Sequence, residues 1–460
     1  MRNVLMLGLL FASDIGCGNS NASIDAAPTG DSGGDAPIVG PAIVVNQGVW
    51  TPNRDGNGDV VVTDFSQLPL QQWVTVGGAL TKLRDVEPLP PYPSGYGPSG
   101  FANITAAWGG AAWDHEHLRM LISGGGHGDA SAAETEIIAV DAVRMETKLV
   151  VDRQPLNSAL RLNGTMLEPG EGFPGGYNNP LSTGVPGSNH TYEGIVWLPP
   201  SEMQTLGLVA PNRGGMFYGG GAKAVVNLDD GKYTKLHWNR NYFDISYLTA
   251  VRWKHTIIMP RSSFYAARFD LLGTEMTDWQ TSGYDPTPTT PSFGANLPTM
   301  SMNREFVGGG RVFCDLPERG EMVSFAAASA RIRYGAAQDA NAATWDAYVD
   351  AITLTSPKAT DFTADNLKDA GTNLLSQGGA HYVHATGEIY VCPNPKDAEL
   401  YRITGVDTAT WTVTKLAGTG LLTTSGNGTY GRFVVFQRNG STIGMRISSV
   451  DNPIEVIRLK

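Results

Sequence analysis

The chain has 460 residues, of which 17% are charged and 56 are glycine, and its formal net charge is −11. An acidic surface repels phosphate backbones, so this balance argues against nucleic-acid binding. Three cysteines without a C-x-x-C spacing exclude a disulfide framework and give no support to a structural zinc site. Many glycines between short apolar runs indicate many tight turns between short strands.

Residues 1–41 are predicted to be a separate N-terminal arm. The apolar run Val4–Phe11 is far too short to span a bilayer and lies at the lower limit for an export signal. Cys17 and the polar residues after it resemble the start of a bacterial lipoprotein, but Asp14 stands where that motif needs a Leu-like residue. The arm is therefore expected to be either an export or lipid-anchoring segment, or an arm that attaches the protein to a larger assembly.

Residues 42–98 are predicted to form a short β-rich lead-in and a Pro-rich connector. The run D-V-V-V-T-D-F at Asp59–Phe65 and the later Q-W-V-T-V are typical of strands, and Gly- and Asn-rich turns separate them. The run P-L-P-P-Y-P-S-G-Y-G-P-S-G at Pro88–Gly100 favours an extended polyproline conformation, which makes a stiff connector.

From residue 99 to residue 460 a rough repeat appears. One unit reads A-A-W-G-G-A-A-W-D at Ala106–Asp114, then L-R-M-L-I-S-G-G-G at Leu118–Gly126, then T-E-I-I-A-V-D at Thr135–Asp141. Repeats of roughly 50 residues, made of three or four short strands with inserted loops, indicate an all-β propeller. The spacing predicts about six blades, with seven as the alternative, and one inserted helix at Asp339–Ile352. The proposed equivalent starts of the units are Trp108, His190, Trp253, Arg304, His381 and Tyr430.

These repeats resemble Kelch repeats, in which an inner strand opens with His or Arg, the next strand ends in a double glycine, and a tryptophan closes the unit. The most specific stretch, L-I-S-G-G-G-H-G-D at Leu121–Asp129, is similar to the double-glycine turn of Kelch and galactose-oxidase-like propellers of bacterial and phage proteins. Trp279 and Trp411 resemble the closing tryptophans that pack between blades. The resemblance covers residues 99–460 loosely and implies a Kelch-like β-propeller.

No metal or cofactor is predicted. Galactose oxidase needs a copper site with a cysteine-linked tyrosine, whereas Cys314 and Cys392 lie in apolar strand-like runs typical of buried small hydrophobic residues. His115 and His117 in D-H-E-H-L have a spacing that places both on one face of a strand, which would suit a metal site. They fall in a predicted turn, however, so a solvated turn is the preferred interpretation.

Candidate ligand-binding residues are the polar and aromatic side chains expected at one end of the central channel, where propellers bind their ligands. The alternative is that these side chains hydrogen-bond neighbouring blades and complete the core. Trp113, Trp238 and Tyr242 are further candidate contacts beside this set, and no catalytic residue is assigned. The ten candidates are Trp108, His127, Asp129, His190, Tyr192, Arg213, His381, Tyr382, Tyr430 and Arg432.

The preferred functional hypothesis is a surface-displayed binding or structural propeller. The resemblance to phage-borne proteins and the N-terminal arm favour a virion decoration or fibre protein that is held by other virion or surface-assembly proteins. Exposed aromatic and hydrogen-bonding groups would then contact host or environmental glycans. The sequence has no G-x-S-x-G, H-E-x-x-H or phosphate-binding glycine loop, so an enzymatic role is not preferred. The expected location is the virion surface.

The alternative hypothesis is an exported or lipid-anchored bacterial enzyme that acts on polysaccharide, located outside the cell or on the outer membrane. Some propeller polysaccharide lyases use a His and Tyr pair with an Arg that neutralises a uronate carboxylate. His190 or His127 with Tyr192 could supply the base and acid, and Arg213 or Arg432 the carboxylate clamp. Residue type alone supports this assignment.

Overall fold

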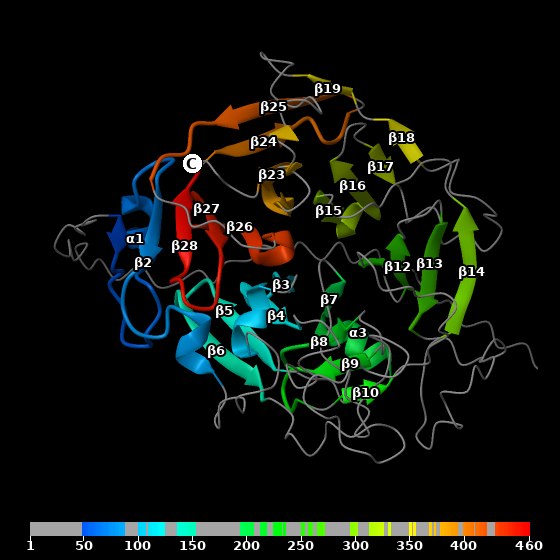
Figure 1. Ribbon diagram of the computed structural model, residues 1–460, viewed down its shortest axis with the longest axis horizontal. Coiled ribbons are helices and arrows are strands. Elements are labelled where there is room, and N and C mark those ends of the chain that lie inside the picture. Colours follow the sequence, from blue (N-terminus) through cyan, green and yellow to red (C-terminus); the bar gives the residue numbers. More distant parts are fainter. Residues whose placement is uncertain are drawn as a thin grey trace, which may run out of the picture. The chain divides into compact units, whose positions relative to one another are not determined.

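The computed structural model of this chain describes many short segments between residues 48 and 460 (Figure 1). Contacts within the chain divide it into residues 1–42 and 43–460, and every described residue belongs to the second unit. The described ranges are 48–87, 100–106, 109–124, 136–152, 194–206, 212–218, 224–231, 233–235, 250–253, 256–260, 265–271, 295–301, 312–325, 330–332, 349–351, 353–355, 368–369, 372–373, 378–393, 399–408, 410–420 and 428–460.

Four of the sheets are four-stranded antiparallel meanders, in which each strand pairs with the next one along the chain. The first contains β3 (Gly110–Asp114), β4 (Arg119–Ser123), β5 (Ile137–Asp141) and β6 (Glu146–Val151). The second contains β7 (Ile195–Leu198), β8 (Gly215–Tyr218), β9 (Ala224–Asn227) and β10 (Tyr233–Lys235). The third contains β11 (Val251–Trp253), β12 (Thr256–Pro260), β13 (Tyr265–Asp270) and β14 (Ala295–Ser301). The fourth contains β15 (Val312–Leu316), β16 (Glu321–Phe325), β17 (Ala330–Ile332) and β18 (Val349–Ala351).

Two further sheets have five strands each, because one or two strands from elsewhere in the chain join an antiparallel core. One contains β22 (Gly379–Val383), β23 (Glu388–Cys392), β24 (Leu400–Thr404) and β25 (Thr410–Leu416), with β19 (Thr353–Thr355) parallel to β25. The other, here called the C-terminal sheet, contains β26 (Phe433–Arg438), β27 (Ser441–Arg446), β28 (Glu455–Arg458), β2 (Trp73–Val76) and β1 (Val49–Trp50). A small ladder joins β20 (Lys368–Asp369) to β21 (Thr372–Asn373).

Helices in the described residues are short. They are α1 (Val62–Gln67), α2 (Asn103–Ala106), α3 (Pro200–Thr205) and the 3-10 turns η1 (Leu83–Val86), η2 (Gly100–Ala102), η5 (Pro317–Arg319), η9 (His384–Thr386) and η10 (Tyr430–Arg432). None of the helices in this part of the chain is long and apolar enough to cross a membrane.

Strands such as β4 and β23 are buried on both faces, which explains their continuous apolar runs. In β4, Met120 and Ile122 pack with the C-terminal sheet, whereas Leu121 packs on the opposite side with Trp197 of β7. The first strands of neighbouring sheets also lie beside one another: β3 beside β7, β15 beside β22, and β22 beside β26. Sheets that pack face to face through both surfaces, with their first strands adjacent, form a propeller-like all-β arrangement.

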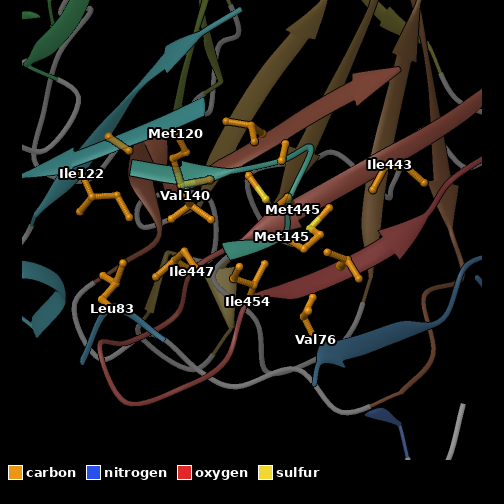
Figure 2. Close-up of a cluster of buried hydrophobic side chains, with 14 of the residues drawn as sticks. Val76, Leu83, Met120, Ile122, Val140, Met145, Ile443, Met445, Ile447 and Ile454 are labelled. Atoms are coloured by element: carbon orange, nitrogen blue, oxygen red, sulfur yellow. The ribbon is translucent and has the colours of Figure 1, made fainter. Parts of the chain in front are cut away.

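The C-terminal sheet joins the two ends of the described chain. Strand β2 pairs antiparallel with β28, with Trp73 opposite Ile457, and blue β2 lies beside red β28 in Figure 1. Figure 2 shows side chains from β2, β4, β5 and β27 meeting in one cluster, among them Val76, Met120 and Met445. The segment predicted as a lead-in therefore contributes strands to the sheet formed by the last residues of the chain.

Three expectations from the sequence are corrected. The described residues contain four regular blades, not about six or seven. The other two large sheets are mixed, because β19 joins one of them and β1 and β2 join the other. The run at Asp59–Phe65 does not form a strand: α1 begins at Val62, after a turn that ends near Val60. Residues Val349–Ala351, at the end of the predicted helix, form β18 and pair with β17.

Candidate functional site

Five of the ten predicted binding residues lie outside the described residues, namely Trp108, His127, Asp129, His190 and Tyr192. The additional candidates Trp238 and Tyr242 also lie outside them. The other five, Arg213, His381, Tyr382, Tyr430 and Arg432, have defined positions.

Arg432 is buried and hydrogen-bonded to the backbone of several segments. It lies in η10 with an exposed fraction of 0%, and burial lowers the pKa of its guanidinium group. The guanidinium donates to five backbone carbonyl oxygens of segments that meet around η10, so its donors point into protein. The acceptors are the carbonyls of Gly109 (2.9 Å), Ile447 (3.0 Å), Ser448 (3.2 Å), Thr105 (3.3 Å) and Gly428.

Tyr430 belongs to the same buried turn. Its exposed fraction is 3%, its φ is +47°, and its backbone N–H donates to Gly378 O at 3.1 Å. The turn lies so close to β3 that a Cβ atom added to Gly431 would stand 2.2 Å from Ala111 O. Tyr430 and Arg432 therefore hold the start of β26 against β3 and β22, which matches the structural alternative considered for them.

Arg213 precedes β8 and contributes mainly through its backbone. Its carbonyl accepts hydrogen bonds from Trp197 Nε1 at 3.3 Å and from the Arg119 guanidinium at 3.5 Å. Its side chain is 42% exposed and lies 3.9 Å from Asp229, which is a loose ion pair. The side chain of Arg213 thus remains accessible to solvent.

His381 and Tyr382 are neighbours on β22 and face opposite ways. Tyr382 packs toward the apolar cluster formed with β15 and β16, and it also contacts the exposed His384 ring. The ring of His381 meets Trp113 of β3 edge-to-face, with centroids 5.8 Å apart. Loss of hydration, together with the nearby charge of His115, lowers the pKa of His381 to about 3, so His381 is neutral at physiological pH.

His115 completes a group that links three sheets. It is exposed in the turn after β3, and its ring meets the Trp197 indole of β7 at 4.9 Å. Trp113 and His381 are each half-buried, whereas Trp197 is 4% exposed. We call Trp113, His115, Trp197 and His381 the imidazole–indole cluster. It places two imidazole rings against two indole rings.

The turn that carries His115 is held by a buried carboxylate. Asp114 is fully buried and accepts hydrogen bonds from Arg119 Nε at 3.0 Å and from His117, whose Nδ1 lies 2.9 Å away. A single φ of +51° at Leu118 reverses the chain before β4. Asp114 and Arg119 thereby fix the turn that displays His115.

The metal alternative for D-H-E-H-L finds no geometric support. His117 turns toward Asp114, whereas His115 turns toward Trp197, so the two imidazoles do not share a target. The described residues contain no group of three or more His, Cys, Asp or Glu side chains arranged to hold a metal ion. Cys314 and Cys392 are both buried, as expected, and burial raises the pKa of the Cys392 thiol to about 12.

Sequence reasoning missed Trp197, Asp114 and Arg119. The apolar run of β7 indicates that Trp197 is buried, but it does not indicate that the Trp197 ring contacts His115, which comes from a different repeat. Asp114 and Arg119 are paired directly across the β3–β4 hairpin, and such a pair of opposite charges flanking a short turn is visible in sequence.

Comparison with known proteins gives similarity to solved structures alone. No protein family matches the sequence, and no curated protein matches it significantly. A fungal alcohol oxidase of the AA5 family, in complex with copper, is 10% identical with a TM-score of 0.35, and the match covers 76% of this chain and 62% of the oxidase. The chain therefore spans less than two thirds of the length of that protein.

Two further solved structures are similar at the same level. The N-terminal domain of Nup159 is 7% identical with a TM-score of 0.33, and the match covers 85% of this chain and 82% of that domain. YCF48 bound to D1 peptide is 9% identical with a TM-score of 0.32, with 81% of this chain and 86% of that chain covered. TM-scores below 0.5 at such identities assign neither a family nor a function to this chain.

Proposed function

We propose that this protein is a non-catalytic binding propeller that contacts glycans through the imidazole–indole cluster. The observation that carries the proposal is two imidazole–indole contacts, Trp113 of β3 with His381 of β22, and His115 of the following turn with Trp197 of β7; His115 is exposed and Trp113 is half-buried. Aromatic rings and hydrogen-bonding groups suit the alternating apolar and hydroxyl surfaces of sugars.

One of the two arginines considered as the carboxylate clamp of a polysaccharide lyase is poorly placed for that role. A carboxylate clamp must present its guanidinium to the substrate, whereas the donors of Arg432 are directed to backbone carbonyls in the protein interior. Arg213, with its accessible side chain, is the remaining arginine for that role. The binding hypothesis needs neither arginine.

The finer parts of the proposal concern class and location. We propose Kelch-like blades, because Trp411 is fully buried between the sheet of β22–β25 and the sheet of β15–β18, where a closing tryptophan would stand. We also propose display on a virion or cell surface through residues 1–41. Mass spectrometry of the native N-terminus tests the location. An intact Met1 in purified particles supports display on a virion, and a lipid on Cys17 refutes display on a virion.

Glycan-array screening followed by calorimetry on the best glycan tests the binding proposal. We expect Trp113→Ala and His381→Ala to weaken binding by roughly tenfold or more, the range of one lost central contact. His384→Ala is the control, because His384 is exposed in η9, the turn after β22, and lies outside the cluster; it should bind normally. Equal binding by all three variants, or release of unsaturated sugars from an acidic polysaccharide, would refute the proposal.

A further inference from the structure

The segment from Asn53 to Asp64, whose composition favours a turn and a strand, has the residue spacing of a calcium-binding loop. It reads N-R-D-G-N-G-D-V-V-V-T-D. In twelve-residue calcium loops, oxygen ligands come from positions 1, 3, 5 and 12 and from the backbone carbonyl of position 7, with glycine at position 6. Here those positions hold Asn53, Asp55, Asn57, Asp64, Asp59 and Gly58.

The backbone follows the same plan. Gly58 has a φ of +82°, the sharp turn that position 6 requires, and Val60 at position 8 is buried in the main core. Helix α1 begins at Val62, so Asp64 lies in its first turn and the loop runs directly into a helix. One oxygen of Asp55 accepts the N–H groups of Asn57 and Asp59, at 2.8 and 3.0 Å, and thereby curls the loop around its centre.

Asp64 is the buried carboxylate of this loop. Its exposed fraction is 2%, and it forms no ion pair with any described residue. Its Oδ2 atom accepts the backbone N–H of Asn53 at 2.6 Å, so the carboxylate is directed back at the first residue of the loop. A buried carboxylate without a cation is costly, and calcium coordination is one of the ways proteins compensate for it.

The neighbouring arginines leave the two loop carboxylates available. Arg144 pairs with Asp59 at 3.0 Å, and Arg54 pairs with Glu146 at 3.2 Å. A calcium loop uses only the backbone carbonyl of position 7, so the ion pair of the Asp59 side chain is compatible with a bound ion. In the structure this carbonyl accepts the N–H of Asp55 at 2.8 Å. Asp55 and Asp64 then supply two negative charges that match a divalent cation.

We propose that residues 53–64 form a calcium-binding loop. The donor set is two carboxylates, two amide side chains and a backbone carbonyl, which are hard oxygen ligands of the kind that calcium prefers. The low ligand charge places the expected dissociation constant at about 10⁻⁴ to 10⁻³ M, the range of extracellular calcium modules. This site is separate from the imidazole–indole cluster and does not depend on the proposed glycan binding.

Calcium at this loop would tie the start of the described chain to its end. Helix α1 carries Phe65, whose ring packs against Trp50 at 5.7 Å and against Phe436 of β26 at 6.1 Å. Fixing Asp64 at the start of α1 therefore fixes the side chain that bridges β1 and β26 of the C-terminal sheet. An ion that binds only the folded loop stabilises the folded protein by mass action.

The test is calorimetric titration of the chelator-treated full chain with calcium chloride, together with thermal unfolding. We expect saturable binding and a rise of a few degrees in melting temperature at about 10 mM calcium, with a much smaller effect of magnesium, which demands tighter octahedral geometry. Asp64→Asn keeps the size of the side chain and an oxygen for the Asn53 N–H. It should weaken calcium binding at least tenfold.

Asp55→Asn is the second variant, because Asp55 is exposed and its replacement should not hinder folding. It should also lose calcium binding. Asp451→Asn is the matched control: it removes the same charge from a side chain that is 64% exposed and paired with Arg84, and it should bind calcium normally. Absence of saturable binding to the unmodified chain, retained affinity in both loop variants, or equal loss in Asp451→Asn would overturn the proposal.

Discussion

Replacement of Arg432 by methionine tests whether this buried arginine is structural. Methionine keeps an unbranched side chain of similar reach but removes the donors to five carbonyl oxygens. Each buried hydrogen bond contributes a net of about 1 kcal/mol, which gives about 5 kcal/mol for the five. Water that enters the vacated space would recover part of this, so we expect a loss of about 3–5 kcal/mol in the free energy of unfolding.

The assay is urea unfolding followed by tryptophan fluorescence, with the midpoint and the slope compared between variants. Arg438→Met is the control, because Arg438 is a half-buried arginine on the neighbouring strand β26, and it should change the free energy of unfolding by no more than about 1 kcal/mol. Arg432→Lys should fall between the two, since one ammonium group cannot reach five divergent acceptors. A loss below about 1 kcal/mol in Arg432→Met would refute the structural assignment.

Three further predictions concern pH and packing. Burial acts to raise the pKa of Glu388, but hydrogen bonds from Lys460 and other groups outweigh burial and lower the pKa. The ionised Glu388 side chain therefore stabilises the folded state above about pH 4.5, and this contribution is lost as pH falls further. Thermal unfolding from about pH 3 to 7 should show a weaker acid dependence in Glu388→Gln. The pKa of His381 is lowered to about 3, so NMR titration of its ring should show no midpoint above about pH 5, and the folded state should lose stability between about pH 6.5 and 3 as the unfolded chain takes up the proton. Gly431→Ala would push a Cβ atom against Ala111 O and should cost roughly 1–3 kcal/mol in denaturant unfolding; an unchanged midpoint would contradict the close approach of η10 to β3.

The all-β, propeller-like arrangement could be predicted because its signal is local. Short apolar runs bounded by glycine, such as the run that forms β4, indicate strands that are buried on both faces. Trp411 could also be placed correctly between two sheets, since a tryptophan in a strand of alternating pattern has few other sites. The blade count could not be predicted, because β2 and β19 join sheets whose other strands lie far away in sequence.

The candidate site was less predictable, for a physical reason. Residue type shows that Arg432 and His381 can bind a ligand, but not whether their polar atoms face solvent or neighbouring backbone. That direction depends on contacts between repeats, such as η10 against β3. The strand prediction at Asn53–Asp64 was wrong for a different reason. The three consecutive valines favour a strand, whereas the proposed ligand spacing is defined by the polar residues on either side of them.

The pairing of β2 with β28 has a consequence for biosynthesis. Because a ribosome releases Trp73 long before Ile457, the nascent chain must carry β2 with an unpaired edge while the intervening sheets form. Such long-range pairing is slow, so the synthesis of β28 sets the moment at which this sheet resists proteases. A chain that terminates before β28 should therefore be cleared by cellular quality control even though most of its blades are present.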